Sequence, residues 1–250
     1  MMSFDKFREV ALSYLRYVII AIIVVLMWVF SVRAMFAQPL PLVRAQHQSF
    51  VSYYDIEKHN PALVVYQLEF SHFAGANKIG TRHFKMDTQL PKPRVKDSDY
   101  SNTGYVRGHL CSAGDRDSNK AWLKETYLTS NVVPMTMVCN SGAFKAIEDT
   151  CRALAMRGHR LLIGRAPVYG DIPTCLEHVS QKRFCIAIPQ AFFCVAMCRD
   201  CDLRLIQVCY NHGSKLLQDV IHFDHDERIS ILLTNIFGVW CREEYETITR

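Results

Sequence analysis

Three polar segments between residues 105 and 152 carry side chains that could together cleave a phosphodiester bond. Arg107-Gly108-His109 comes first, Asn131 follows twenty-two residues after the histidine, and Asn140 follows nine residues later. A histidine suits a general base because its unperturbed pKa, about 6.5, lies near neutral pH. An arginine can bind phosphate through its fork of donors. Gly108 would let the backbone turn sharply beside a substrate, although an Arg-Gly-His turn alone is a weak signal.

The helix predicted over residues 141–157 carries further candidates. Asn140 at its start offers a neutral oxygen, and Mg²⁺ needs few protein ligands because it keeps several waters. Glu148 would lie about two turns further along the same side, where it could hold a metal-bound water. Arg152, four residues on, could pair with Glu148 or meet phosphate. The plain alternatives are an N-cap for Asn140 and a surface ion pair for Glu148 and Arg152.

Length and composition allow one large domain or two small ones. The chain has 250 residues, half of them hydrophobic, and a net charge of +5. This mild basicity is compatible with an acidic polymer as partner and equally with an ordinary enzyme. Ten cysteines suit an exported protein with up to five disulfides, or a mixture of buried thiols and a few bridges. Cys198 and Cys201 have zinc-like spacing, but no second such pair follows, so a disulfide or a loop is preferred.

The N-terminal segment, residues 1–37, predicts a membrane anchor or a signal peptide. Residues 17–32 run without a charge, which is intermediate between a signal-peptide core and a full membrane span. Basic residues precede this run and should keep the N-terminal end in the cytoplasm. The long polar start favours an uncleaved anchor. We therefore expect an exported domain that is anchored and faces outward, or is periplasmic or secreted if the leader is cleaved.

Hydrophobic patterns predict one domain over residues 49–250, after a Pro-containing linker at 38–48. Strands are predicted at 62–70, 160–168, 183–189, 192–197 and 203–210. Helices are predicted at 121–125, 141–157 and 226–237, and the middle one has an apolar side formed by Phe144, Ile147, Cys151, Leu154 and Ala155. Strands on either side of a central helix predict an α+β fold with a mostly antiparallel sheet, preceded by the N-terminal hydrophobic helix.

Taken together, the motifs resemble the DNA/RNA non-specific endonuclease family, the ββα-metal nucleases. The family signature is Asp-Arg-Gly-His-Leu, then Ser-Asn-x-x-Pro-Gln, then Asn-x-x-x-Trp-x-x-Leu-Glu-x-x-x-Arg. This chain matches its spacing without a gap from His109 to Arg152. Upstream, Arg82-x-Phe84 resembles the family's Arg-x-Trp/Phe element, and residues 164–169 resemble its Gly-Pro-x-Tyr strand with an insertion. The resemblance covers roughly residues 50–240.

This resemblance implies a magnesium-dependent, sugar-non-specific endonuclease that hydrolyses DNA and RNA through a ββα-metal active site. His109 would be the general base, and Asn140 would bind Mg²⁺, with Mn²⁺ as the alternative ion. Asn131 would set the geometry around the histidine, and Glu148 would hold a metal-bound water. The residues expected to face phosphate are Arg82, Arg107 and Arg152. The family often forms homodimers, so a second copy is an expected partner beside nucleic acid and, through residues 17–32, the membrane.

Three positions depart from the family pattern. Met135 replaces Gln and Phe144 replaces Trp, and both are tolerable packing changes. Val106 stands where the family has a carboxylate that could orient Arg107. This change keeps a second function open, a catalytically impaired, membrane-anchored nucleic-acid-binding protein on the same scaffold. If Arg107 is poorly positioned because residue 106 has no carboxylate, Val106→Asp should raise the cleavage rate. If the strand has adapted to valine, the same change should destabilise the fold.

Overall fold

The structure is a computed structural model that describes residues 42–75, 77–78, 83–170, 172–176, 184–201 and 203–212, and the backbone of 216–217. The chain divides into two compact units, Met1–Pro41 and Leu42–Arg250. The first unit, with the predicted anchor at 17–32, lies outside the described residues, and so do Arg82 and the helix predicted at 226–237. Within the described ranges, no helix has the length and apolar character needed to cross a membrane.

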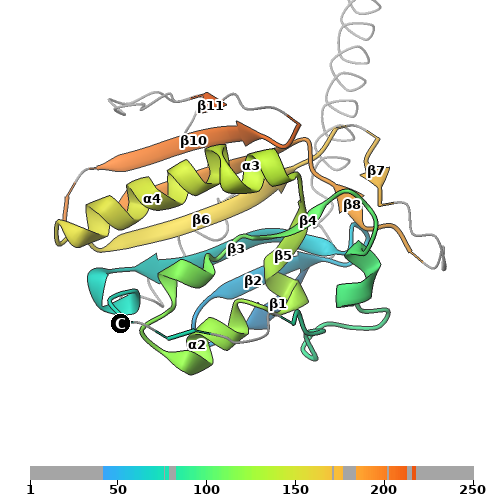
Figure 1. Cartoon of the computed structure of the whole chain (residues 1–250), viewed down its shortest axis with the longest axis horizontal. Coiled ribbons are helices and arrows are strands. Elements are labelled where there is room, and N and C mark those ends of the chain that lie inside the picture. Colours follow the sequence, from blue (N-terminus) through green and yellow to red (C-terminus); the bar gives the residue numbers. More distant parts are fainter. Residues whose placement is uncertain are drawn as a thin grey trace, which may run out of the picture. The chain divides into compact units, whose positions relative to one another are not determined.

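A seven-stranded sheet forms the body of the second unit (Figure 1), in the strand order β1-β2-β3-β6-β9-β10-β11. Every neighbouring pair is antiparallel. The strands are β1 Leu42–Gln46, β2 Val51–Asp55, β3 Asn60–Leu68, β6 Leu161–Val168, β9 Ala191–Cys198, β10 Arg204–Tyr210 and β11 Leu216–Leu217. The predicted α+β class with a mostly antiparallel sheet is confirmed.

The chain leaves this sheet between β3 and β6 and builds the part that carries the candidate chemistry. Two short strands, β4 Val106–His109 and β5 Val132–Met135, pair antiparallel. The helices are α2 Lys120–Glu125, α3 Met137–Ser141 and α4 Ala143–Met156, and the 3₁₀ turns are η1 Phe70–His72, η2 Asp97–Tyr100, η3 Ala113–Asp115 and η4 Thr129–Asn131. Beyond β6, strands β7 Thr174–Cys175 and β8 Ala187–Ile188 form a separate two-stranded ladder.

Helix α4 packs on the sheet because one of its sides is apolar (Figure 1). Phe144, Ile147, Cys151 and Ala155 are buried in the main hydrophobic core, and the Phe144 ring meets the Phe192 ring of β9 edge-on at 5.5 Å. Burial of each large apolar side chain contributes about 1.5–3 kcal/mol. The predicted helix is therefore confirmed, with one difference: Gly142 interrupts it and separates α3 from α4.

Two sequence-based boundaries were wrong. Residues 42–46 fall within the predicted linker at 38–48, but they form β1, which pairs along its whole length with β2. The prolines just before this strand suggested a linker, and the strand lies at the edge of the sheet, where part of its surface stays exposed. In the predicted strand at 183–189, only Ala187–Ile188 is a strand among the described residues.

The described cysteines divide between the core and two disulfides. Cys175 pairs with Cys185, and Cys198 pairs with Cys201. The free thiols are all buried in the main core; they belong to Cys111, Cys139, Cys151, Cys194 and Cys209. The mixed interpretation of the cysteine count is therefore confirmed for this part of the chain, and Cys241 lies outside it.

Candidate active site

Strands β4 and β5 present His109 at the end of a short ladder, where it pairs with Val132. The Arg-Gly-His segment is thus a strand and not the turn that was expected. Gly108 is needed for packing rather than for turning, since a Cβ atom there would lie 2.7 Å from the Cβ of Met135. Only glycine allows the two strands to approach this closely without displacement.

The imidazole of His109 is half-buried and lies between two aromatic rings. The Phe84 ring is tilted at 5.1 Å between centroids, and the Tyr127 ring is edge-on at 5.0 Å. The backbone hydrogen bond from Lys85 to Tyr127, 2.9 Å long, ties the two ring-bearing segments together. These contacts limit the orientations that the histidine ring can adopt, which is what a proton acceptor aimed at one water requires.

Asn131 fixes the chain immediately after the histidine. Its Oδ1 accepts from the Cys111 amide at 2.7 Å, and its Nδ2 donates to the carbonyls of Cys111 and Thr126 at 2.9 Å each. Its backbone carbonyl also accepts from the amide of Leu110 at 2.9 Å. Asn131 is fully buried, so losing these bonds would leave several polar groups unsatisfied. Asn131 therefore fixes the backbone next to His109, and its role in catalysis stays a prediction.

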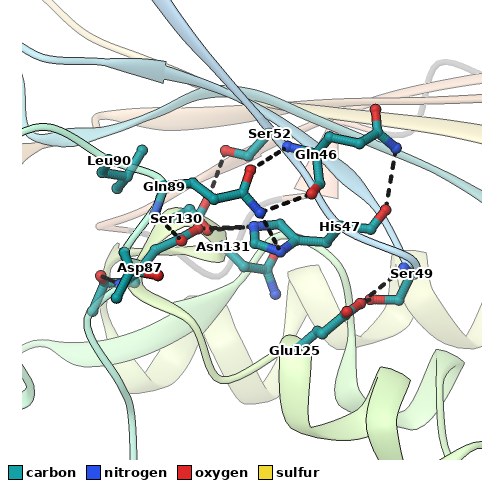
Figure 2. A network of polar contacts seen from close by, with 12 residues as sticks. Gln46, His47, Ser49, Ser52, Asp87, Gln89, Leu90, Glu125, Ser130 and Asn131 are labelled. Atoms are coloured by element: carbon teal, nitrogen blue, oxygen red, sulfur yellow. Dashed lines mark hydrogen bonds and ion pairs between the residues drawn. The ribbon is translucent and has the colours of Figure 1, made fainter.

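A polar network lies behind Asn131 (Figure 2) and joins the turn between β1 and β2 to η4. His47 Nε2 contacts Asp87 Oδ2 at 2.8 Å, and Ser130 Oγ lies 3.4 Å from the same nitrogen. Ser52 donates to the carbonyl of Ser130 at 2.6 Å. Burial alone would raise the pKa of Asp87, but the hydrogen bonds from His47 and Ser130 outweigh it and the pKa is lowered. The network anchors the Ser-Asn motif to the sheet.

Arg107 has a carboxylate partner that the sequence did not identify. Its Nε forms an ion pair with Asp97 Oδ1, and its Nη2 donates to the Asp97 carbonyl at 2.6 Å. The guanidinium also lies 5.7 Å from the centre of the Phe84 ring and 5.5 Å from that of Tyr100. Asp97 is ten residues upstream, in η2, within a stretch that the sequence marked only as turn-rich. The contacts hold the guanidinium beside the Phe84 ring, which also contacts His109.

Val106 does more than deprive Arg107 of a carboxylate partner. Its side chain is half-buried and packs against the main core. Successive side chains of a strand point to opposite faces, so residue 106 faces the core while Arg107 faces Asp97. This favours the second of the two alternatives, that the strand has adapted to valine.

Glu148 and Arg165 connect α4 to the histidine segment. Arg165 Nη1 lies 3.3 Å from Glu148 Oε1 and donates to the carbonyl of Leu110, the residue after His109, at 2.8 Å. Burial raises the pKa of Glu148, and Arg165 only partly counters it. Arg165 is fully buried beside the rings of Tyr66 and Phe144. Arginine is rarely buried. A single arginine within the apolar run of β6 is therefore the sequence signal that could have identified Arg165 as a functional residue.

Arg152 is engaged by carboxylates. Its Nη1 contacts Asp115 Oδ1 at 2.7 Å, and its Nη2 lies 2.6 Å from Asp149 and 3.7 Å from Glu148. Asp115 is fully buried and also accepts from the Tyr66 hydroxyl at 2.8 Å. The ion pair with Glu148 predicted at i+4 is present, whereas phosphate contact by Arg152 stays a prediction.

Asn140 lies inside α3, and the helix packs against β4. The N-cap is Thr136, whose Oγ1 accepts from the Cys139 amide at 3.2 Å. The N-cap interpretation of Asn140 was therefore wrong. The break at Gly142 also removes the expected two-turn spacing to Glu148, because the two residues do not share one continuous helix. Asn140 is half-buried, and its role as a metal ligand stays a prediction.

The β4–β5 ladder thus carries His109, and helix α4 carries a carboxylate–arginine network that reaches the residue after this histidine. Residues 33–228 match the family model "DNA/RNA non-specific endonuclease". The chain belongs to this family, whose members are phosphodiester-hydrolysing nucleases.

Individual relatives agree with this assignment. The chain is 27% identical over 172 residues to the mitochondrial nuclease EXOG of Xenopus laevis, covering 64% of this chain and 47% of that protein. It is 33% identical over 116 residues to a nuclease of Nostoc sp., covering 46% and 42%. It is 24% identical over 152 residues to human mitochondrial endonuclease G, covering 58% and 51%. The matches span about half the length of these relatives.

The fold also matches a solved structure. A chain in the crystal structure of the EndoG/EndoGI complex superposes with a TM-score of 0.57 at 20% identity, covering 81% of this chain and 86% of that chain. At this identity the comparison supports the fold alone.

Proposed function

We propose that this protein is a magnesium-dependent, sugar-non-specific endonuclease that hydrolyses phosphodiester bonds of DNA and RNA. The observation that carries the proposal is the placement of His109. Its ring is oriented by Phe84 and Tyr127, and the chain after it is fixed by Asn131 and Arg165. A general base contributes about 10²–10⁴-fold only when it is held within reach of the proton it removes.

The residues take the following roles. His109 accepts the proton of the attacking water at a ring nitrogen. Arg107, oriented by Asp97 and by the rings around it, binds a non-bridging phosphate oxygen through its guanidinium. Asn131 and Arg165 act on the histidine through the backbone of the residues that follow it. Arg82 and Arg152 are proposed to add positive charge along the substrate backbone.

The oxygen donors near the hairpin fit Mg²⁺. Glu148 is already engaged by Arg165 and Arg152, so we assign direct contact with the ion to the neutral amide of Asn140, and Glu148 would hold a water of the ion's shell. Hard oxygen donors in small number suit Mg²⁺, and Mn²⁺ accepts the same set. When bound, the ion supplies positive charge that stabilises the leaving oxygen.

Plasmid degradation by the full chain, with and without a chelator, tests this function. Supercoiled DNA and a folded RNA should both be cut when Mg²⁺ is present, and EDTA should stop both reactions. Retained nucleic-acid binding without cleavage would instead support the second function, a catalytically impaired binding protein on the same scaffold.

We also propose that residues 38–250 lie outside the cytoplasm, with residues 17–32 as the anchor. The uncharged run and the basic residues before it support this orientation. The disulfides Cys175–Cys185 and Cys198–Cys201 are compatible with an oxidising compartment. Alkaline phosphatase fused after Arg250 should be active in cells, and an inactive but well-expressed fusion would contradict export.

A further inference from the structure

We propose that His159, Cys198 and Cys201 form a zinc site when the two cysteines are reduced. The site is separate from the catalytic residues and uses a different ligand chemistry. It takes a borderline-soft divalent cation through two thiolates and one imidazole, with the fourth position open to water.

The sheet brings these residues together from segments forty positions apart. Strands β6 and β9 are antiparallel, with Leu161 opposite Cys198, so the residues before β6 lie beside the end of β9. Gly158, at a φ of +91°, reverses the chain after α4, so that His159 lies beside the end of β9. Cys201 follows in the turn to β10, which is closed by the hydrogen bond from the Cys198 amide to the Leu203 carbonyl at 2.9 Å.

The two nitrogen–sulfur distances fit a tetrahedral zinc centre, and reduction must let the two sulfurs, now joined as a disulfide, move apart. His159 Nδ1 lies 3.7 Å from Cys198 Sγ and 3.8 Å from Cys201 Sγ, and the three ligand atoms lie within 4.8 Å of one another. With Zn–S near 2.3 Å and Zn–N near 2.05 Å, tetrahedral angles require a nitrogen–sulfur separation of about 3.6 Å. The distance from the imidazole Nδ1 to each sulfur is therefore already close to the separation between two ligands of one zinc ion. A disulfide makes no use of such a histidine, because sulfur is only a weak hydrogen-bond acceptor.

Neighbouring contacts hold the two segments in place without help from the sulfurs. The Arg199 amide donates to the Arg160 carbonyl at 2.9 Å, and Arg160 Nε donates to Asp200 Oδ2 at 3.0 Å. Cys201 is exposed, while Cys198 and His159 are half-buried, so a cation can reach the ligands from solvent. The site is thus both pre-positioned and open.

Binding depends on the state of the two sulfurs, which are joined as a disulfide in the structure. A phosphine, which takes an oxygen atom from water and becomes its oxide, breaks the S–S bond, and the two protons of that water complete the two thiols; two equivalents of a small thiol do the same and leave as their own disulfide. Zn²⁺ then binds both sulfurs as thiolates and releases their two protons. Thiolate and imidazole donors select Zn²⁺ over Mg²⁺, so this site does not compete for the ion proposed at Asn140. The thiols that are free in the structure are buried in the core. The reductant also opens the Cys175–Cys185 disulfide, so variants of His159 and Cys201 decide which thiols hold the ion.

The test uses the full chain and Co²⁺ alone as the spectroscopic probe. After reduction with a phosphine and removal of excess reductant, the protein should bind one equivalent of Co²⁺ with the thiolate charge-transfer and visible bands of a tetrahedral centre. Zn²⁺ should displace it with loss of the bands. The oxidised protein should give no bands, and bands of equal strength before and after reduction would overturn the proposal.

Variants identify the ligands. His159→Ala and Cys201→Ser should each weaken Zn²⁺ binding by about 100-fold or more, since even indirect partners of a metal site can cost 10–100-fold. His159→Cys should restore binding with a stronger charge-transfer band. The control is His212→Ala, which removes an exposed histidine elsewhere on the chain. Circular dichroism checks that each variant is folded. Folded ligand variants that bind like the wild type, or a reduced wild type that binds no Co²⁺, would show that the three residues form no metal site.

Discussion

Replacing Asp97 by asparagine should impair catalysis far more than it impairs folding. The ion pair with Arg107 is partly exposed, since the side chains of Arg107 and Asp97 keep 25% and 40% of their accessible surface. A pair this exposed stabilises the fold by about 1 kcal/mol or less, so the melting temperature should fall by no more than about 2–4 °C.

The effect on the rate has a different origin. Asparagine keeps the backbone carbonyl that accepts from Arg107 Nη2 but loses the charge that holds Nε. A displacement of about 1 Å beside the reacting groups can cost about 100-fold. Because one of the two contacts survives, we expect a loss of roughly 10- to 100-fold in kcat/KM, or about 1.4–2.7 kcal/mol at the barrier.

The assay is magnesium-dependent cleavage of a fluorescent DNA duplex, measured beside a thermal melt. Asp99→Asn is the matched control, because Asp99 lies in the same turn and accepts from the Lys96 amide at 2.7 Å. Asp97→Glu should recover part of the rate, since it restores the charge. An Asp97→Asn variant that cleaves within about two-fold of the wild type, or that loses rate only in proportion to a large loss of stability, would refute the positioning role of Asp97.

The remaining predictions concern the hairpin, the metal and the network behind Asn131. Val106→Asp should lower the melting temperature without raising the rate, because it buries a carboxylate against the main core at a cost of about 1–3 kcal/mol; a faster enzyme of unchanged melting temperature would contradict this. Asn140→Ala should weaken both activity and the response to Mg²⁺ while the fold is kept, because Thr136 and not Asn140 caps the helix; a folded variant with an unchanged magnesium titration would remove Asn140 as a ligand. Asp87→Asn should destabilise the fold by about 1–3 kcal/mol at neutral pH. Since the pKa of Asp87 is lowered in the folded state, its contribution is complete above the ordinary value near 3.9 and is lost as the pH falls through the lowered one. The difference in melting temperature between wild type and Asp87→Asn should therefore close in strong acid, and a constant difference would argue against a contribution from the Asp87 carboxylate.

Regular elements were predictable wherever local pattern and packing agree. A hydrophobic pattern within ten or fifteen residues predicts each of the apolar strands β3, β6, β9 and β10 and the amphipathic helix α4. Strand β1 was not predictable in this way, because the prolines just before it suggested a linker and its order depends on pairing with β2. The interruption at Gly142 was also missed, since the apolar side that predicted the helix runs from Phe144 to Ala155 and says nothing about the residues before Gly142.

The residues that could do chemistry were predictable by type and spacing, but their partners were not. The spacing led to His109, Asn131 and Glu148, and the structure gives each of these a partner in the site. Asp97 and Arg165 reach the site through tertiary contacts with residues ten and seventeen positions away, Arg107 and Glu148. No local pattern encodes such pairs, because they depend on how the loop before β4 folds back and on which face of β6 meets α4.

The role of His109 as the base is the central claim, and single-turnover cleavage by His109→Ala tests it most directly. Removal of a general base should slow the chemical step by roughly 100-fold or more, while binding of the same DNA, measured by fluorescence anisotropy in Ca²⁺, should change little. The variant should melt within a few degrees of the wild type, because the His109 ring, which lies beside Phe84 and Tyr127, is only half-buried. A folded His109→Ala protein that binds DNA and cleaves it within a few-fold of the wild-type rate would contradict the account.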